Sequence, residues 1–282
     1  MADPSSRDRP SAVALVQASH PEPSVAVTGI TTALAVSSGL GPRSALVAAA
    51  FLTGQLSVGW SNDWIDAARD RRSARLDKPV ARGQLRPETV RGAALGALAL
   101  CVPLSLALGL AAGSLHLLAV AAAWAYNARL KATVLSFAPY AFAFGAVPSI
   151  VTLALDDPGF APAWATAAGA LLGVGAHLCN VLPDLEDDLA AGVRGLPHRL
   201  GPRVSAALAA VLLLAASTLL AVGPGRPGTG AVVTVLVAGS VTTGGLALGS
   251  RPGSRAPFRA ALVVAALCVG LLLSRGAVLA PG

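Results

Sequence analysis

The sequence predicts an all-α fold, a polytopic membrane bundle of about nine transmembrane helices around a central cavity. Composition is the first reason. Of the 282 residues, 54% are hydrophobic and 12% are charged, whereas a soluble domain carries about 25% charged residues. The second reason is that apolar runs recur along the whole chain, most of them near the roughly 20 residues that cross a bilayer.

Nine apolar runs define a single transmembrane domain over residues 24–282. The preceding residues 1–23 are polar and contain prolines, so we expect a disordered cytoplasmic tail there. The fourth run is short. The spans are predicted at Ser24–Gly41, Ser44–Ser61, Glu88–Ala112, Ser114–Tyr126, Thr133–Leu155, Pro162–Leu182, Val204–Val222, Gly230–Gly249 and Pro257–Leu279.

The basic residues are distributed unevenly over the loops between these spans. With nine spans, the tail and the loops after spans two, four, six and eight share one side and carry 18 of the 21 Lys and Arg. Because basic loops remain in the cytoplasm, this side is expected to face the cytoplasm from the cell (inner) membrane. Loop placement also explains the net charge of +7, so no nucleic-acid partner is predicted.

An acidic row follows the second span directly. On a helix with 3.6 residues per turn, Asn62, Asp66 and Asp70 lie on one face, and Asp63 lies beside them. A charge at membrane depth costs about 2.5–3.5 kcal/mol on insertion scales. Such a row therefore needs water, a partner or a cation.

A second acidic row ends the sixth span, where Asn180, Asp184 and Asp188 repeat the same spacing. The charge distribution puts both rows at the cytoplasmic face. Solvated acids that balance nearby arginines are the simpler interpretation of either row alone, but the repetition favours a shared role. Asp187 and Glu186 are additional acids whose orientation the spacing does not decide.

Two facing rows of carboxylates and amides fit magnesium chemistry. Mg²⁺ prefers oxygen ligands and is usually held by one or two carboxylates together with substrate phosphates. Loop cations could contact the phosphate oxygens that the metal leaves free, although most of them are expected to act only as topology signals. The cations near the rows are Arg69, Arg71, Arg72, Arg75, Lys78, Arg82, Arg129, Lys131, Arg194 and Arg199.

An apolar bundle beneath a bound diphosphate would accommodate a lipid tail. Metal binding would neutralise charge on the leaving diphosphate, and aromatic faces could stabilise an allylic cation. Packing or interfacial anchoring is the alternative role for each aromatic ring. The candidates are Trp60, Trp64, Trp124, Tyr126, Phe137, Tyr140 and Phe142.

The histidines add no second motif. No partner can be predicted for His20, His116 or His198, and His177 is expected to be a packed, neutral residue although it lies one turn before Asn180.

These motifs together resemble the UbiA superfamily of intramembrane prenyltransferases. Asn62–Asp70 is similar to its N-D-x-x-D-x-x-x-D motif, and Asp184–Asp188 to its D-x-x-x-D motif. Arg75–Gly83 resembles R-x-x-R-P-x-x-x-G, with Lys78 where arginine is usual. Tyr126–Lys131 resembles the tyrosine-to-lysine motif before the fifth span.

The resemblance implies a Mg²⁺-dependent site and a polyprenyl diphosphate donor. It assigns metal binding to Asn62, Asp66, Asp70, Asp184 and Asp188. Tyr126 would shield or stabilise the allylic cation and, with the four aspartates of that set, completes the predicted catalytic residues. The remaining predicted substrate contacts are Asp63, Arg75, Lys78, Lys131, Asn180 and Arg194.

Three functions remain open at this point. The first is transfer of a prenyl group to an acceptor, which could be an aromatic ring, a quinone precursor or a lipid. The second is a terpene cyclase that uses the same site without an acceptor, although the 4% aromatic content argues mildly against it. The third is a non-catalytic transporter or lipid-binding bundle, which predicts charges inside the spans rather than at their ends.

Overall fold

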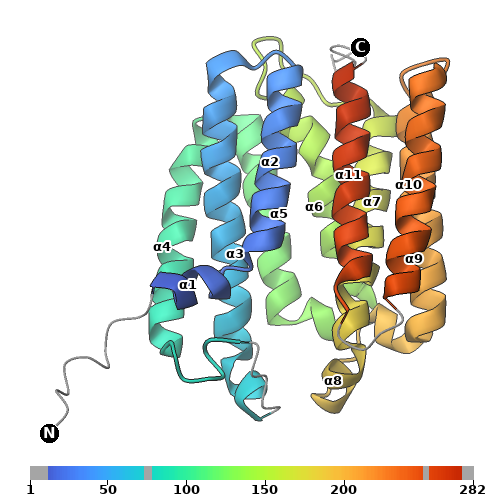
Figure 1. Ribbon diagram of the computed structural model, residues 1–282. Coiled ribbons are helices and arrows are strands. Elements are labelled where there is room, and N and C mark those ends of the chain that lie inside the picture. Colours follow the sequence, from blue (N-terminus) through green and yellow to red (C-terminus); the bar gives the residue numbers. More distant parts are fainter. Residues whose placement is uncertain (1–11, 73–77, 250–253, 275–282) are drawn as a thin grey trace, which may run out of the picture.

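The computed structural model describes residues 12–72, 78–249 and 254–274, which consist of helices and turns with no strand among them (Figure 1). The α-helices are α1 (Ala12–Ala18), α2 (Pro21–Ser37), α3 (Ser44–Arg72), α4 (Pro87–Leu106), α5 (Leu110–Ala128), α6 (Ala138–Thr152), α7 (Ala163–Val181), α8 (Leu185–Ala190), α9 (Leu196–Val222), α10 (Thr229–Leu248) and α11 (Ala256–Ser274). Short 3-10 helices are η2 (Gly41–Arg43), η3 (Leu130–Ala132), η4 (Val134–Phe137) and η5 (Leu182–Asp184).

The predicted all-α bundle is confirmed. Among the described residues, every predicted apolar run corresponds to one long helix, from α2 to α7 and from α9 to α11. Within the part of the chain that the structure describes, six helical segments are long and apolar enough to cross a membrane. Of the others, α2 has only 17 residues and α3 has polar and acidic residues in its second half. The count of nine spans therefore stays a prediction.

Two predicted span boundaries are corrected by the turn between α4 and α5. The third span was expected to continue to Ala112, but α4 ends at Leu106 and α5 begins at Leu110. Gly109 lies in this turn with a φ of 113°, a conformation that glycine adopts without steric cost. The fourth helix gains the residues that the third loses, so α5 has 19 residues instead of a short span.

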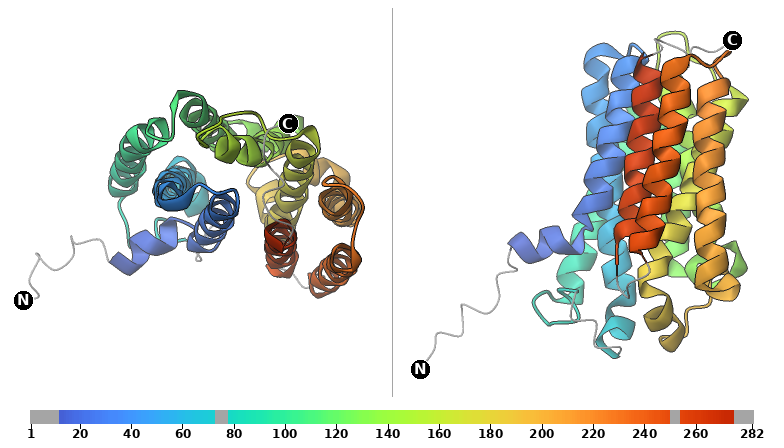
Figure 2. Two further views of the ribbon diagram at one scale, coloured as in Figure 1. Left: turned by 90° about the horizontal axis from the view of Figure 1, so that it is seen from above. Right: turned by 45° about the vertical axis from the view of Figure 1, so that its right-hand side comes forward.

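The long helices run roughly parallel to one another, and from above they form a curved row in which α11 lies beside α2 (Figure 2). Arg259 of α11 and Glu22 of α2 join these two helices through an ion pair of 2.7 Å. Close packing depends on small residues elsewhere. A Cβ atom added to Gly169 would lie 2.5 Å from the carbonyl oxygen of Phe144, so α7 can approach α6 only because that position is glycine.

The N-terminal segment differs from the expected disordered tail over residues 12–23. It forms α1 and the first turn of α2, and α1 packs on α3. The indole N–H of Trp60 donates to the carbonyl oxygen of Leu15 at 2.9 Å, and Ala14 and Ala18 are buried. These contacts give a short apolar helix a surface on which to fold, which the local composition did not reveal.

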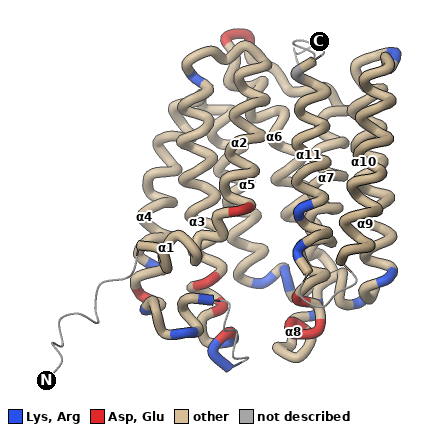
Figure 3. Tube along the Cα trace, in the orientation of Figure 1, with Lys and Arg blue, Asp and Glu red and all other residues tan. Residues whose placement is uncertain are grey.

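Charged residues gather at one end of the bundle, as Figure 3 shows. The acidic rows, the turns over residues 78–86 and the segment from η5 to α8 all lie at this end. The turn between α6 and α7 lies at the opposite end (Figure 1), and Asp156 in this turn pairs with Arg43 at 3.4 Å. The structure therefore has the uneven charge distribution that the loop sequences predicted.

Candidate active site

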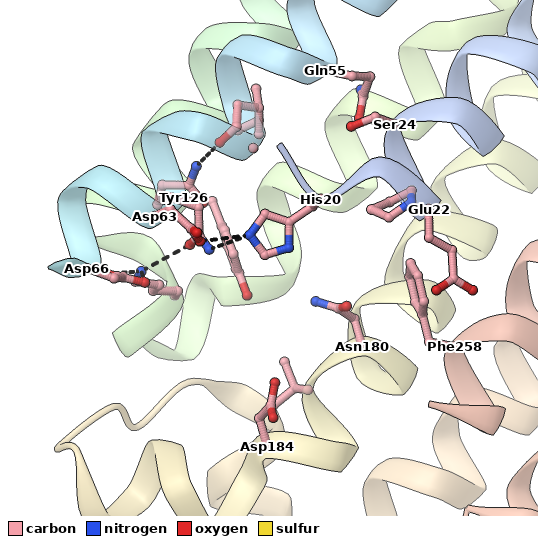
Figure 4. A pocket seen from close by; sticks show the side chains of 18 of the residues that line it. His20, Glu22, Ser24, Gln55, Asp63, Asp66, Tyr126, Asn180, Asp184 and Phe258 are labelled. Carbon is pink, nitrogen blue, oxygen red and sulfur yellow. Dashed lines mark hydrogen bonds and ion pairs between the residues drawn. The ribbon is translucent and has the colours of Figure 1, made fainter. Parts of the chain in front are cut away.

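A cavity of about 630 Å³ connects the two acidic rows. Its wall combines polar groups at the charged end with apolar side chains such as Val27, Ala143 and Phe144. Of the residues predicted for the site, those that line the cavity are Asn62, Asp63, Asp66, Asp70, Lys78, Tyr126, Lys131, Asn180, Asp184 and Asp188. In Figure 4, Asp63 and Asp66 lie on one side and Asn180 and Asp184 on the other.

The first row lies on the continuous helix α3, as the spacing predicted. Asp63, Asp66 and Asp70 are only 2%, 4% and 5% exposed. Burial of unpaired carboxylates is costly, so each must find a cation or a hydrogen-bond donor. The chain itself supplies these partners.

Three cations hold the first row. The Lys131 ammonium contacts both carboxylate oxygens of Asp66, and Arg69 Nη2 lies 2.6 Å from Asp66 Oδ2. Lys78 bridges two acids, with Nζ 3.1 Å from Asp63 Oδ1 and 3.2 Å from Asp70 Oδ2. The predicted Lys78 and Lys131 therefore do lie at the acidic row.

The two lysines differ in their electrostatic balance. Burial alone would lower the pKa of Lys78, but the carboxylates of Asp63, Asp70 and Asp66 outweigh burial and raise it above its ordinary value. For Lys131, burial prevails over the attraction of Asp66, and its pKa is lowered. Lys78 is thus firmly cationic, whereas Lys131 releases its proton more readily.

The second row is not one continuous helical face, which corrects the sequence prediction. The helix α7 ends at Val181, η5 follows over Leu182–Asp184, and α8 begins at Leu185. Pro183 has no backbone N–H and cannot continue the hydrogen-bond ladder of α7. The break still leaves all three predicted residues of the row at the cavity wall.

The orientation of the other two acids is now clear. Glu186 and Asp187 are exposed and do not line the cavity. Asp188 does line it, and its Oδ2 lies 3.3 Å from Nε2 of His198, whose side chain is 2% exposed.

Aromatic residues form the part of the wall between the rows. The rings of Tyr126 and Tyr140 meet edge to face at a centroid distance of 5.2 Å, and His177 lies 4.9 Å from Tyr140. His177 is fully buried and within 3.1 Å of Ser136 Oγ, as expected for a packed residue. Of the aromatic candidates from sequence, only Tyr126 and Tyr140 line this cavity.

For two predicted substrate contacts, Arg194 and Arg75, the structure provides no supporting contact. Arg194 is exposed and is not part of the cavity wall, so the structure gives no support to its predicted role. Arg75 lies outside the described residues, and its role stays a prediction.

Sequence reasoning missed several residues of the wall. The histidines His20 and His198 each contact an acid of one row, and Gln55 lies in the apolar part of the wall. His20 directly precedes Pro21 and lies four residues before the first predicted span, which begins at Ser24. No spacing rule connects it with an acidic row more than forty residues later.

The oxygen ligands at the cavity suit a Mg²⁺ ion that binds together with a substrate rather than a Mg²⁺ ion held by the protein alone. Asn62, Asp66 and Asp70 face Asp184 and Asp188 across the cavity, and all supply hard oxygen atoms. Among the described residues, no three His, Cys, Asp or Glu side chains are grouped closely enough to hold a metal ion by themselves. Mg²⁺ typically completes its shell with water and substrate phosphate, which agrees with this arrangement.

The fold and the cavity define a class of protein, a membrane-type helical bundle with two acidic rows and several cations at one end of a partly apolar pocket. The family model described as the UbiA prenyltransferase family matches residues 24–260. The chain therefore belongs to the UbiA prenyltransferase family, and it is an integral membrane protein and an enzyme of the prenyltransferase type.

Solved structures have the same fold. A UbiA homologue from Aeropyrum pernix K1, without ligand, is 20% identical, with a TM-score of 0.72 over 90% of this chain and 98% of that one. A UbiA homologue from Archaeoglobus fulgidus, bound to GPP and Mg²⁺, is 18% identical, with a TM-score of 0.67 over 92% of this chain and 97% of that one.

A digeranylgeranylglyceryl phosphate synthase is also similar, at 16% identity and a TM-score of 0.63, over 94% of this chain and 98% of that one. No curated protein sequence matches the chain.

Proposed function

We propose that this protein transfers the prenyl group of a polyprenyl diphosphate to an acceptor within the membrane, with Mg²⁺ as cofactor and diphosphate as the leaving group. One observation carries the proposal. A single cavity contains both acidic rows and the cations Lys78, Lys131 and Arg69 at its charged end, and it continues into an apolar wall. A diphosphate headgroup and a prenyl tail need these two environments side by side.

The oxygen atoms of Asn62, Asp66, Asp70, Asp184 and Asp188 would hold Mg²⁺. When bound with the substrate, the metal would neutralise charge on the departing diphosphate. Binding of the A. fulgidus homologue to GPP and Mg²⁺ supports this assignment. Lys131 and Arg69 now pair with Asp66, so they are positioned to move to phosphate oxygens when a metal takes the carboxylate.

The chain's own residues would control the allylic fragment. In the transfer step, the bond between the first prenyl carbon and the diphosphate oxygen breaks, and the electron pair leaves with diphosphate. Tyr126 and Tyr140 line the cavity beside the acidic rows, where their ring faces could stabilise the resulting cation. An acceptor atom then bonds to that carbon and loses a proton.

The charge distribution supports the proposed location of the site. The positive-inside rule puts the charged end, and with it the acidic rows, on the cytoplasmic side of the cell membrane. An assay in sealed vesicles would test this orientation. A water-soluble donor analogue should be consumed when it is added on the cytoplasmic side and not when it is added on the other side.

The reaction itself is tested with purified protein, Mg²⁺ and a panel of prenyl diphosphates, with diphosphate release measured with and without candidate acceptors. Release that requires an acceptor is expected. Release without an acceptor, accompanied by a cyclic hydrocarbon, would instead establish a cyclase. Absence of release with every donor would contradict both enzymes and leave the transporter or lipid-binding function.

A further inference from the structure

His20 has an unusual backbone conformation at the junction between α1 and α2. Its φ of 52° and ψ of 65° are left-handed, and among the described residues no other non-glycine residue has a positive φ. Side chains with a Cβ atom rarely adopt this region, and when they do, the surrounding structure must hold them there. The contacts of His20 show which residues hold it in this conformation and which side chain it orients.

The ring of His20 reaches the first acidic row. Its Nε2 lies 2.9 Å from Asp63 Oδ1, and since an ionised carboxylate can only accept, the histidine donates this bond (Figure 4). Lys78 approaches the same carboxylate oxygen at 3.1 Å. Asp63 is 2% exposed, so these two donors determine how its carboxylate is oriented.

The segment before His20 is held against α3 one turn away from Asp63. A Cβ atom added to Gly59 would lie 2.2 Å from the carbonyl oxygen of Ser19, so only glycine allows the two backbones to come this close. The neighbouring Trp60 donates to the carbonyl oxygen of Leu15 at 2.9 Å. The segment is also tied internally, because Ser24 Oγ donates to the Ser19 carbonyl at 3.0 Å.

We propose that His20 is a positioning residue for Asp63 and that the segment before it, with Ser19 against Gly59 and α1 bonded to Trp60, keeps it in place. This inference rests on the proposed function, since it gives the acidic row its orientation for binding Mg²⁺ and diphosphate. The N-terminal segment is then part of the active site.

Two kinds of variant test the proposal. His20→Ala removes the ring, and Gly59→Ala displaces the segment without changing any polar side chain. We expect each to weaken binding of Mg²⁺ with inorganic diphosphate by about 10–100-fold, the usual effect of removing a residue that orients a metal ligand. Titration calorimetry in detergent measures this without turnover.

Matched controls separate positioning from general damage. Gly92→Ala makes the same change on an exposed helix face where an added Cβ meets nothing within 4 Å, so binding should equal that of the wild type. His20→Asn keeps a side-chain donor and suits the left-handed backbone, so it should recover part of the affinity. A purely structural role would lower the melting temperature of the His20→Ala protein without this pattern in affinity.

A second measurement follows the segment directly. Ser19 is 2% exposed and the three native cysteines are buried, so a Ser19→Cys protein should react slowly with a polar maleimide. Adding Gly59→Ala should accelerate the reaction. If Gly59→Ala does not fold, Trp60→Phe, which keeps an aromatic ring but deletes the bond to Leu15, replaces it in both measurements.

The outcomes are distinguishable. Wild-type affinity in both His20→Ala and the Gly59 or Trp60 variant would overturn the inference and leave the proposed function intact. A wild-type protein that binds no Mg²⁺ and diphosphate would instead contradict the proposed function itself.

Discussion

The two acidic rows present similar residues in different physical states. The first row lies on the unbroken helix α3, its acids are almost fully buried, and Lys78, Lys131, Arg69 and His20 hold them. The second row is divided between α7, η5 and α8, and the side chain of Asp188 is 24% exposed. The first row is therefore neutralised by the protein, whereas the second is nearer to solvent.

Because of this difference, a ligand must displace more of the protein's own contacts at the first row than at the second. A cation that enters at Asp66 must displace Lys131 and Arg69, which then become available to phosphate oxygens. Asp188 has a histidine partner at 3.3 Å and needs less rearrangement. We infer that the first row couples metal binding to diphosphate binding more strongly than the second.

The largest loss of activity is expected from two single variants, each of which neutralises one acid of one row. Asp66→Asn and Asp184→Asn should each reduce diphosphate release by about 100-fold or more, because each removes a charged group that would act at the developing charge. Asp66→Asn should also lower the free energy of unfolding, by about 3 kcal/mol, since it leaves Lys131, whose side chain is 11% exposed, without its carboxylate. Assays and thermal melts measure both, and full activity in either variant would contradict the model of two rows.

The second largest effect should be a difference in the free energy of unfolding between variants of the first row and variants of the second. Lys78→Met leaves Asp63 and Asp70 without their shared cation, and we expect a loss of about 2 kcal/mol in the free energy of unfolding without Mg²⁺. His198→Leu removes a contact to the partly exposed Asp188 and should cost less than about 1 kcal/mol. Arg129→Met, at an exposed position, serves as a control. Equal melting temperatures for all three proteins would show that the rows do not differ in this way.

A smaller effect is expected from the break in the second row. Pro183→Ala allows the hydrogen-bond ladder of α7 to extend into η5, which would turn Asp184 and Asp188 relative to α3. Diphosphate release should fall by about 10-fold, because small displacements of catalytic groups reduce rates steeply. Pro162→Ala, at the other end of α7, is the matched control. If Pro183→Ala is as active as the control, the break does not orient the second row.

The smallest effects should come from charges that lie outside the cavity. Glu186→Gln, Asp187→Asn and Arg194→Ala change exposed residues, and activity and stability should remain within about 2-fold and 0.5 kcal/mol of the wild type. Initial rates of diphosphate release and melting curves measure this. A loss of 10-fold or more for Arg194→Ala would restore it to the substrate site.

Much of the site was predictable because helical spacing is local. Asn62, Asp66 and Asp70 follow from the period of α3, and the cations of the following loop are close to them in sequence. The break at Pro183 was also visible in the sequence, yet the predicted row ran through it. The spacing of the acids stays regular across Pro183, whereas the helix does not, because proline lacks the backbone N–H that the ladder needs.

What the sequence by itself determined is the membrane bundle, the gathering of charge at one end and the identity of the two acidic rows, since hydropathy and helical period act within one segment. Only the tertiary structure decided which cation pairs with which acid, that Glu186 and Arg194 face away, and that His20 reaches Asp63. These depend on contacts between segments far apart in the chain. The close approach at Gly59 is of this kind, because it requires the position of the Ser19 backbone to be known.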